Sequence, residues 1–216
     1  MVDFWGVVRL GPNQLQGIVL ACWAYSGFSN TATAITPTAI ALLAQQADGT
    51  LKLAGEQFLS SSMVNGAGSV LVADFNGDGK DDIFLAAHNE SPFIAKASTA
   101  YLSKPDSTFT KVALTDSVMA HGANLATIKG KPTVLAATYS TITNPIYTYD
   151  GQGGFRVNMT AGNVYGDAVA AADFLGNGGT QIVYADVAAG PGYSAPPNSA
   201  LVQILWRYEN EKIVGE

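Results

Sequence analysis

The 216-residue sequence has few charged residues, a single cysteine and two histidines. Charged residues make up 13% of the chain, the formal net charge is -6, and lysine and arginine form no cluster, so nucleic acid is excluded as a partner. Cys22 lies in an apolar run and has no second cysteine to pair with, which indicates a buried thiol. No apolar run reaches the roughly 18 residues that a membrane-spanning helix needs.

Common catalytic motifs are also missing. The chain has no Gly-x-Ser-x-Gly elbow, no His-Glu-x-x-His pair and no Gly-x-x-x-x-Gly-Lys phosphate loop. No basic segment followed by a hydrophobic core marks a signal peptide, but the chain begins inside an expected strand. We therefore expect upstream residues, including an export signal.

Short apolar runs and small residues dominate what is present. Hydrophobic residues make up 48% of the chain, and there are 23 glycines. This composition favours short buried strands joined by small-residue turns, in one large all-β domain. Runs such as Val70–Ala73 and Ile182–Ala185 are apolar at successive positions, which is typical of strands buried on both faces.

The stretch from Asp74 to Asp82 has the pattern of a calcium loop between two strands. Calcium takes six to eight oxygen ligands, and oxygen side chains occupy loop positions 1, 3, 5 and 9, with a backbone carbonyl expected at position 7. The expected ligands are Asp74, Asn76, Asp78, Lys80 and Asp82. An EF-hand is excluded because Leu85 occupies the position of its bidentate glutamate. The alternative is a Gly/Asp-rich turn without metal.

Three other segments align with this loop and its flanking strands, which indicates an internal repeat. They are Val7–Ala21, Leu125–Ala136 and Ala171–Ala185. None keeps the full ligand set: Arg9 replaces the first aspartate, lysines occupy the third loop, and the fourth loop has leucine and glutamine at positions 3 and 9. The loops start at residues 9, 74, 127 and 173, a spacing typical of four-stranded propeller blades.

Each interval between loops supplies two further expected strands. These are Ile40–Leu43 with Leu51–Leu53, Thr99–Leu102 with Phe109–Ala113, Pro145–Tyr149 with Phe155–Val157, and Leu201–Trp206 with Ile213–Val214.

The segment Val72–Ile83 is similar to the FG-GAP/VCBS repeat of integrin α-chain propellers and of many secreted bacterial proteins. The literal Phe-Gly and Gly-Ala-Pro signatures are absent, and Gly66–Gly68 is the nearest equivalent. The resemblance implies a β-propeller, and the four repeats predict about four four-stranded antiparallel blades in residues 1–216, starting near residues 3, 68, 121 and 167. It also implies one bound Ca²⁺.

The expected ligand-binding face is the one opposite the calcium loop. Its long loops carry the aromatic residues Phe28, Phe93 and Tyr193, which can stack on sugars or anchor a protein. Near the propeller axis, the aligned positions are Asp3, Gly68, His121 and Asp167. Both sets have plainer interpretations, as aromatic residues that pin loops and as polar residues that line a channel.

The sequence thus predicts a calcium-binding module, secreted or on the cell surface, for adhesion or for recognition of carbohydrate or protein. One alternative is a polysaccharide lyase or hydrolase using His121, Asp167 and Asp3. Another is a propeller half completed by a homo-oligomer or by further blades, because the flanks of the first and last blades are open.

Overall fold

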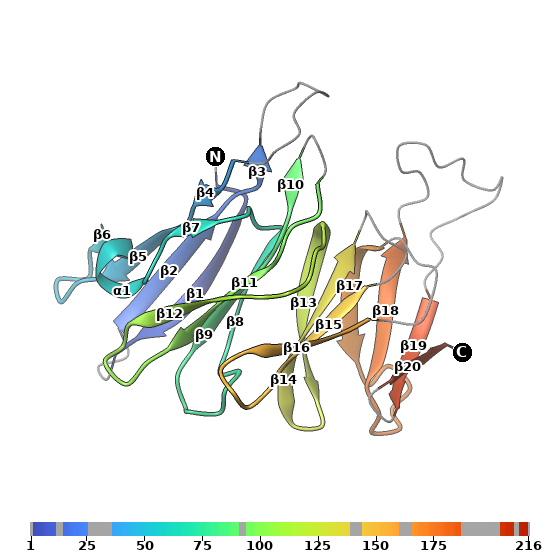
Figure 1. Ribbon diagram of the computed structural model, residues 1–216. Helices are drawn as coiled ribbons and strands as arrows, with labels where there is room; N and C mark the ends of the chain where they lie inside the picture. Colours follow the sequence, from blue (N-terminus) through green and yellow to red (C-terminus); the bar gives the residue numbers. More distant parts are fainter. Residues whose placement is uncertain are drawn as a thin grey trace.

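The computed structural model describes residues 2–11, 15–25, 36–90, 94–138, 144–159, 166–186, 204–209 and 212–215. In this part the chain is all-β apart from one helical turn, α1 (Gly55–Phe58). Four four-stranded antiparallel sheets follow one another along the chain (Figure 1). No helix among the described residues is long and apolar enough to cross a membrane.

The strands of each sheet are paired in chain order. Sheet 1 contains β1 (Phe4–Leu10), β2 (Leu15–Ala21), β5 (Ala41–Gln45) and β6 (Leu51–Leu53). Sheet 2 contains β8 (Ser69–Ala73), β9 (Asp82–Ala86), β11 (Thr99–Ser103) and β12 (Phe109–Ala113). Sheet 3 contains β13 (Ala120–Ile128), β14 (Lys131–Thr138), β15 (Pro145–Tyr149) and β16 (Phe155–Met159). Sheet 4 contains β17 (Gly166–Ala172), β18 (Gln181–Asp186), β19 (Ile204–Glu209) and β20 (Lys212–Gly215).

Four shorter strands pair outside these sheets. β3 (Ala24–Tyr25) pairs in parallel with β10 (Asn89–Glu90), and β4 (Thr38–Ala39) pairs with β7 (Met63–Val64). They lie at the end of the sheets away from the β8–β9 loop (Figure 1).

The expected all-β class is confirmed. The two strands that flank each predicted loop are also confirmed, because each aligned segment forms the first two strands of a sheet. The outer strands also match, with small shifts: β5 begins at Ala41 and β19 runs from Ile204. Where the sequence predicts a propeller, the described sheets form a row that does not close into a ring (Figure 1).

Neighbouring sheets pack face to face through three apolar clusters. The cluster between sheets 1 and 2 includes Val8, Val19, Leu42, Ile83 and Tyr101. The cluster between sheets 2 and 3 includes Phe75, Phe84, Val134, Ala136 and Tyr147. The cluster between sheets 3 and 4 includes Ile128, Leu135, Val169, Ile182 and Tyr184. Successive apolar residues form these strands because a middle sheet buries both of its faces.

The first strands of the sheets lie side by side and leave little room for side chains. A Cβ at Gly6 would lie 2.8 Å from a methyl carbon of Val70, and a Cβ at Gly68 would lie 2.1 Å from the carbonyl oxygen of Ala120. Glycine at these two positions therefore allows the close approach of neighbouring sheets.

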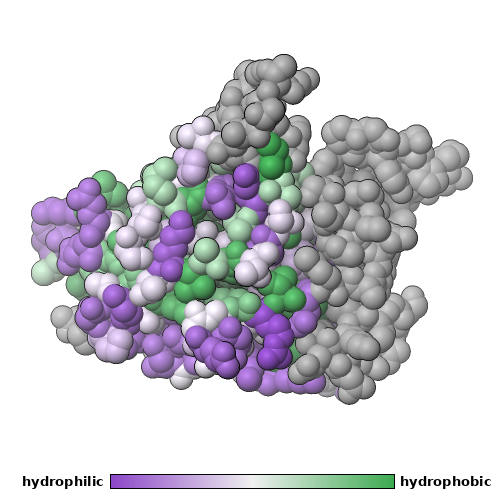
Figure 2. All heavy atoms as spheres, viewed as in Figure 1, coloured by the Kyte–Doolittle hydropathy of each residue, from purple (hydrophilic) through white to green (hydrophobic). Residues whose placement is uncertain are grey.

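Polar side chains concentrate at the strand ends. In Figure 2, hydrophilic residues gather along the lower edge of the molecule, where Figure 1 places the β8–β9, β11–β12 and β15–β16 turns. This edge carries the candidate site.

Candidate functional site

The loop from Asp74 to Asp82 joins β8 to β9 and is organised around its first aspartate. The Asp74 Oδ1 atom accepts hydrogen bonds from the backbone N–H groups of Gly77 (2.7 Å) and Asp78 (3.0 Å), and Oδ2 accepts one from Gly79 (2.8 Å). Gly77 and Gly79 adopt φ values of 80° and 84°, which favour glycine. The chain thus winds tightly around one carboxylate.

Two further side chains turn into the same loop. Asn76 Oδ1 accepts the N–H of Asp78, and Asp78 Oδ1 accepts the N–H of Lys80, each at 2.9 Å. These hydrogen bonds are Asx turns, in which a side-chain oxygen takes the amide two residues further along the chain. Alternate side-chain oxygens are therefore held along the inside of the loop.

Asp82 is the buried member of the set. Its side chain is fully buried; Oδ2 accepts the N–H groups of Phe75 (3.0 Å) and Asn76 (3.4 Å), and Oδ1 accepts that of Ser103 (2.8 Å). Burial raises the pKa of this carboxyl group, although the three hydrogen bonds act in the opposite direction. Asp82 fastens the start of the loop to β9 and places a negative charge where water solvates it poorly.

Arg9 neutralises the neighbouring Asp81 across the sheet 1–sheet 2 boundary. The backbone N–H of Arg9 donates to Asp81 at 2.8 Å, and the guanidinium group forms an ion pair with the same carboxylate. Burial disfavours the charged form of Asp81, but the hydrogen bonds from Arg9 outweigh it and lower its pKa. The residue that replaces the first loop aspartate in repeat one therefore serves the interface between sheets.

The turn from Asp173 to Gln181 gives an internal comparison, because it keeps the loop geometry with a different position 9. The carboxylate of Asp173 accepts the N–H groups of Asn177 (2.9 Å) and Gly178 (2.7 Å), as Asp74 does in its own loop. At position 9, Gln181 Oε1 accepts the N–H of Leu175 at 3.0 Å, as Asp82 accepts that of Asn76.

The Gln181 side chain also supplies what Asp82 lacks. Its Nε2 donates to Asn177 Oδ1 (3.3 Å) and to the carbonyl oxygen of Gly179 (3.1 Å), which are loop positions 5 and 7. In the Asp74–Asp82 loop the same positions are Asp78 and Lys80, and an ionised aspartate at position 9 has no hydrogen to donate to them. In the second loop these oxygens therefore receive no hydrogen bond from the residue at position 9.

Oxygen donors of this kind suit a hard divalent cation. Within the described ranges, no three His, Cys, Asp or Glu side chains are gathered as a closed metal centre. The candidate ligands are instead engaged by backbone N–H groups, and Asn76 and the Lys80 carbonyl lie outside that set of residue types. The residues fit calcium by donor chemistry and by their excess of negative charge.

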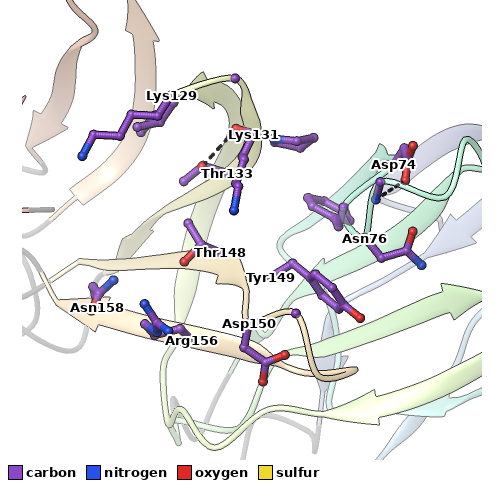
Figure 3. Close-up of a pocket in the computed structure, with 16 residues that line it drawn as sticks. Asp74, Asn76, Lys129, Lys131, Thr133, Thr148, Tyr149, Asp150, Arg156 and Asn158 are labelled. Carbon is purple, nitrogen blue, oxygen red and sulfur yellow. Dashed lines mark hydrogen bonds between the residues drawn. The ribbon is translucent and has the colours of Figure 1, made fainter.

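A groove of about 730 Å³ borders the loop and separates it from the turns of sheet 3. Its charged and polar lining includes Asp74, Asn76, Lys129, Lys131, Thr133, Thr148, Tyr149, Asp150, Arg156 and Asn158. In Figure 3, Lys131 extends from the β13–β14 turn toward Thr148, while Tyr149 points toward the side of the groove formed by Asn76. Sequence reasoning missed this groove, because the two lysines were interpreted only as the loss of a calcium site.

One acidic residue of the groove is occupied within its own turn. Asp150 Oδ1 accepts the N–H groups of Gln152 (2.7 Å) and Gly154 (3.0 Å), and these hydrogen bonds lower its pKa. Arg156 contributes a further, smaller lowering. The other acidic residue, Asp74, belongs to the candidate calcium loop.

The ligand residues expected on the opposite face are only partly described. Phe28, Phe93 and Tyr193 lie outside the described residues, as does the side chain of Asp167, which belongs to β17. Asp3 lies just before β1, where its backbone N–H donates to Ala21. A shared site of Asp3, His121 and Asp167 stays a prediction.

His121, at the start of β13, lies against His88, which follows β9. The rings of His88 and His121 are 4.9 Å apart at their centroids, and Trp23 lies 5.4 Å from His88 on its other side. His88 is buried. Their proximity depends on the packing of separate sheets, for which the sequence contains no local signal.

The family comparison supports the repeat. A family model described as an FG-GAP-like repeat matches residues 27–85, whereas curated proteins gave no match. The matched segment includes β5 and β6 of sheet 1 and β8 and β9 of sheet 2 with the loop between them. The resemblance drawn from the loop motif is thereby confirmed, because residues 27–85 of this all-β chain are similar to an FG-GAP-like repeat.

Proposed function

We propose that this chain is a calcium-stabilised, propeller-type recognition module that acts outside the cell, with its four sheets as blades. The FG-GAP-like repeat and the succession of four-stranded sheets support the architecture. Extracellular modules bind calcium at about 10⁻⁴–10⁻³ M, so a single loop of modest affinity suits that environment.

The observation that carries the calcium proposal is the contrast between Asp82 and Gln181. The Gln181 amide nitrogen donates to the oxygens of loop positions 5 and 7, whereas an ionised Asp82 at the same position 9 has no hydrogen to donate to the equivalent oxygens. A bound cation there also offsets the burial of the Asp82 carboxylate, whose raised pKa reflects poor solvation of its charge. Calcium would thus satisfy in the second loop the oxygens that the Gln181 amide nitrogen satisfies in the fourth.

We assign recognition to the groove beside this loop, with an acidic carbohydrate as the ligand class. Lys131 and Arg156 supply positive charge for carboxylates, Asn158 supplies amide hydrogen bonds, and Tyr149 supplies a ring face for a sugar. Asp150 is occupied within its own turn. Calcium in the neighbouring loop would compensate the charge of Asp74, so ligand binding should strengthen with calcium.

Thermal unfolding with and without calcium tests the metal site. At a calcium concentration 100 times the dissociation constant, mass action contributes about 2.7 kcal/mol, which raises the midpoint by about 5–10 °C in a chain of this size. Asp78→Ala should abolish the calcium-induced shift. Asn177→Ala is the matched control, because Asn177 occupies the equivalent loop position 5 in the turn that contains Gln181, and this variant should leave the shift intact.

A second pair of variants tests the comparison of the two loops directly. Asp82→Gln should lose the calcium response, since the introduced amide can donate to positions 5 and 7. Leu175→Asn combined with Gln181→Asp should add a response in the fourth loop. A wild-type midpoint that is unchanged by about 10–100 mM calcium, 100 times the expected dissociation constant, would overturn the calcium proposal.

Calorimetric titration with polygalacturonate, an acidic polysaccharide, tests the groove. Lys131→Ala and Arg156→Ala should each weaken binding several-fold, while Lys52→Ala, on β6 away from the groove, should not. Dextran is the neutral control ligand. Equal binding by the three variants would remove the groove from the proposal and leave the calcium result unaffected.

A further inference from the structure

Sheets 2, 3 and 4 each bury one face against the sheet that precedes them. We call this the docking face. In the first strand it consists of the residues four and two positions before the start of the loop. In sheets 2, 3 and 4 these residues are Val70 and Val72, Ala123 and Leu125, and Val169 and Ala171. None of the six is classed as exposed, and each packs with its interface cluster.

Sheet 1 carries the same face, with a larger residue at the first position, and no other described sheet packs on it. The equivalent positions are Trp5 and Val7, whose exposed fractions are 66% and 45%. The pairing of β1 with β2 and β2 with β5 places Ile18, Leu20 and Leu43 in the same rows. On the outer strand β6, Leu51 and Leu53 are 45% and 74% exposed. The part of this face that these residues form is therefore apolar and in contact with solvent.

Among the described residues, no further sheet packs on the opposite face of sheet 4, which we call the leading face. In the first three repeats, the residue at loop position 2 is buried against the following sheet: Leu10, Phe75 and Ile128 are 4%, 5% and 6% exposed. The fourth such residue, Phe174, is 51% exposed. Residues 168, 170 and 172 on the leading side of β17 are exposed alanines.

We propose that the docking face of sheet 1 packs against the leading face of sheet 4 of a second copy of this chain. Both halves of the contact are present in every copy, and Figure 1 shows sheets 1 and 4 at opposite ends of the row. Such a head-to-tail contact is heterologous and closes when two copies satisfy each other's ends. Two copies bring eight sheets together, within the range of about 4–8 blades found in propellers.

Contacts between the sheets of one chain indicate which residues meet. The residue four positions before each loop lies against the first strand of the preceding sheet. A Cβ on Gly6 of β1 would be 2.8 Å from Val70, and Asn124 of β13 donates to the carbonyl of Val169 at 3.3 Å. By the same register, Trp5 of one copy meets Ala168 and Ala170 of the other. The largest side chain at this position thus faces the strand with the smallest side chains.

The loop residues give a second point of contact. Phe75, at loop position 2, lies against Phe155 at the beginning of the fourth strand of sheet 3, with ring centroids 5.5 Å apart. The equivalents at the open ends are Phe174 and Leu51, which begins the fourth strand of sheet 1. Both are about half exposed in the single chain, at 51% and 45%.

Sedimentation velocity of the purified chain across a concentration series tests the contact. We expect the wild type to sediment as a dimer at twice 22.4 kDa. Trp5→Glu and Phe174→Glu should each raise the dissociation constant at least about 30-fold, as the loss of an interface hot spot does. Both side chains are exposed in the single chain, so unfolding curves of the variants should match the wild type under monomeric conditions.

Met63→Glu provides the matched control, because Met63 is also 45% exposed but lies on β7, outside both faces. Mixing the Trp5→Glu and Phe174→Glu chains should restore one intact contact and recover association, which a sheet 1-to-sheet 1 dimer would not do. A wild type that stays monomeric at a chain concentration of about 100 μM, 100 times a micromolar dissociation constant, overturns the proposal. A dimer that tolerates Trp5→Glu also overturns it.

Discussion

Three fully buried tyrosines, one each in sheets 2, 3 and 4, allow the polar part of the core to be tested with the smallest possible substitution. Tyr101, Tyr147 and Tyr184 are at most 1% exposed, and tyrosine to phenylalanine removes only the hydroxyl group. The three hydroxyl groups have different surroundings. The free energy of unfolding should therefore respond to the three substitutions in a fixed order.

Tyr147→Phe should cost the most. Its hydroxyl donates to Asp116 Oδ2 at 2.7 Å and lies 3.3 Å from the Ser98 hydroxyl, and Asp116 itself is buried. A hydrogen bond to a charged group contributes about 1.5–3 kcal/mol. The Tyr101 hydroxyl donates to the neutral carbonyl of Ser61 at 2.8 Å, so Tyr101→Phe should cost about 0.5–1.5 kcal/mol.

Tyr184→Phe should be neutral or stabilising. Within the described part of the chain, its buried hydroxyl has no hydrogen-bond partner, and an unsatisfied buried hydroxyl opposes folding by about 1–3 kcal/mol. Removing it relieves that desolvation cost while the ring stays in place.

Chemical denaturation followed by tryptophan fluorescence gives the three free energies, and thermal unfolding gives an independent ranking. A loss of 2 kcal/mol lowers the midpoint by about 4–8 °C in a chain of this length. Equal costs for all three substitutions, or a destabilising Tyr184→Phe as large as Tyr147→Phe, would refute the assignment of these hydroxyl groups.

Three further outcomes follow from the packing and the charges. Gly68→Ala should destabilise the chain by more than about 3 kcal/mol, measured by urea denaturation, because the added Cβ meets the Ala120 carbonyl at 2.1 Å rather than a movable side chain. Asp81 has a lowered pKa in the folded state, so its contribution to stability is present above about pH 4 and is lost as the pH falls further. Asp81→Asn should flatten the acid limb of a stability–pH profile. Burial raises the pKa of Tyr101, Tyr147 and Tyr184, so stability should fall as the pH rises above about 10, where the unfolded chain loses phenolic protons that the folded chain keeps.

Much of the fold could be predicted because the signals are local. Runs of successive apolar residues marked the strands buried on both faces, and the repeated hairpin fixed the pairing of β8 with β9 and of its three equivalents. Gly77 and Gly79 marked the tight winding of the loop, and both take positive φ.

The remaining features depend on contacts between sheets, which no local pattern encodes. The ion pair of Arg9 with Asp81 joins residues 72 positions apart, so the sequence showed Arg9 only as the loss of the ligand at loop position 1. From the sequence, Gln181 is also only a lost ligand. In the structure its amide nitrogen donates to the oxygens at loop positions 5 and 7. The groove beside Tyr149 arises from the distance between two sheets and could not be inferred from either one.

The boundaries of the sequence repeat bear on how the chain folds. The FG-GAP-like segment at residues 27–85 begins after β2 and ends within β9, so it contains the outer strands of one sheet and the inner strands of the next. A fragment cut at these limits would hold two incomplete sheets, each with unpaired strand edges and half of an apolar cluster. The matched segment is therefore not expected to fold on its own. Cooperative folding must extend across neighbouring sheets, and a duplicated repeat becomes stable only when the strands on both sides of it are already present.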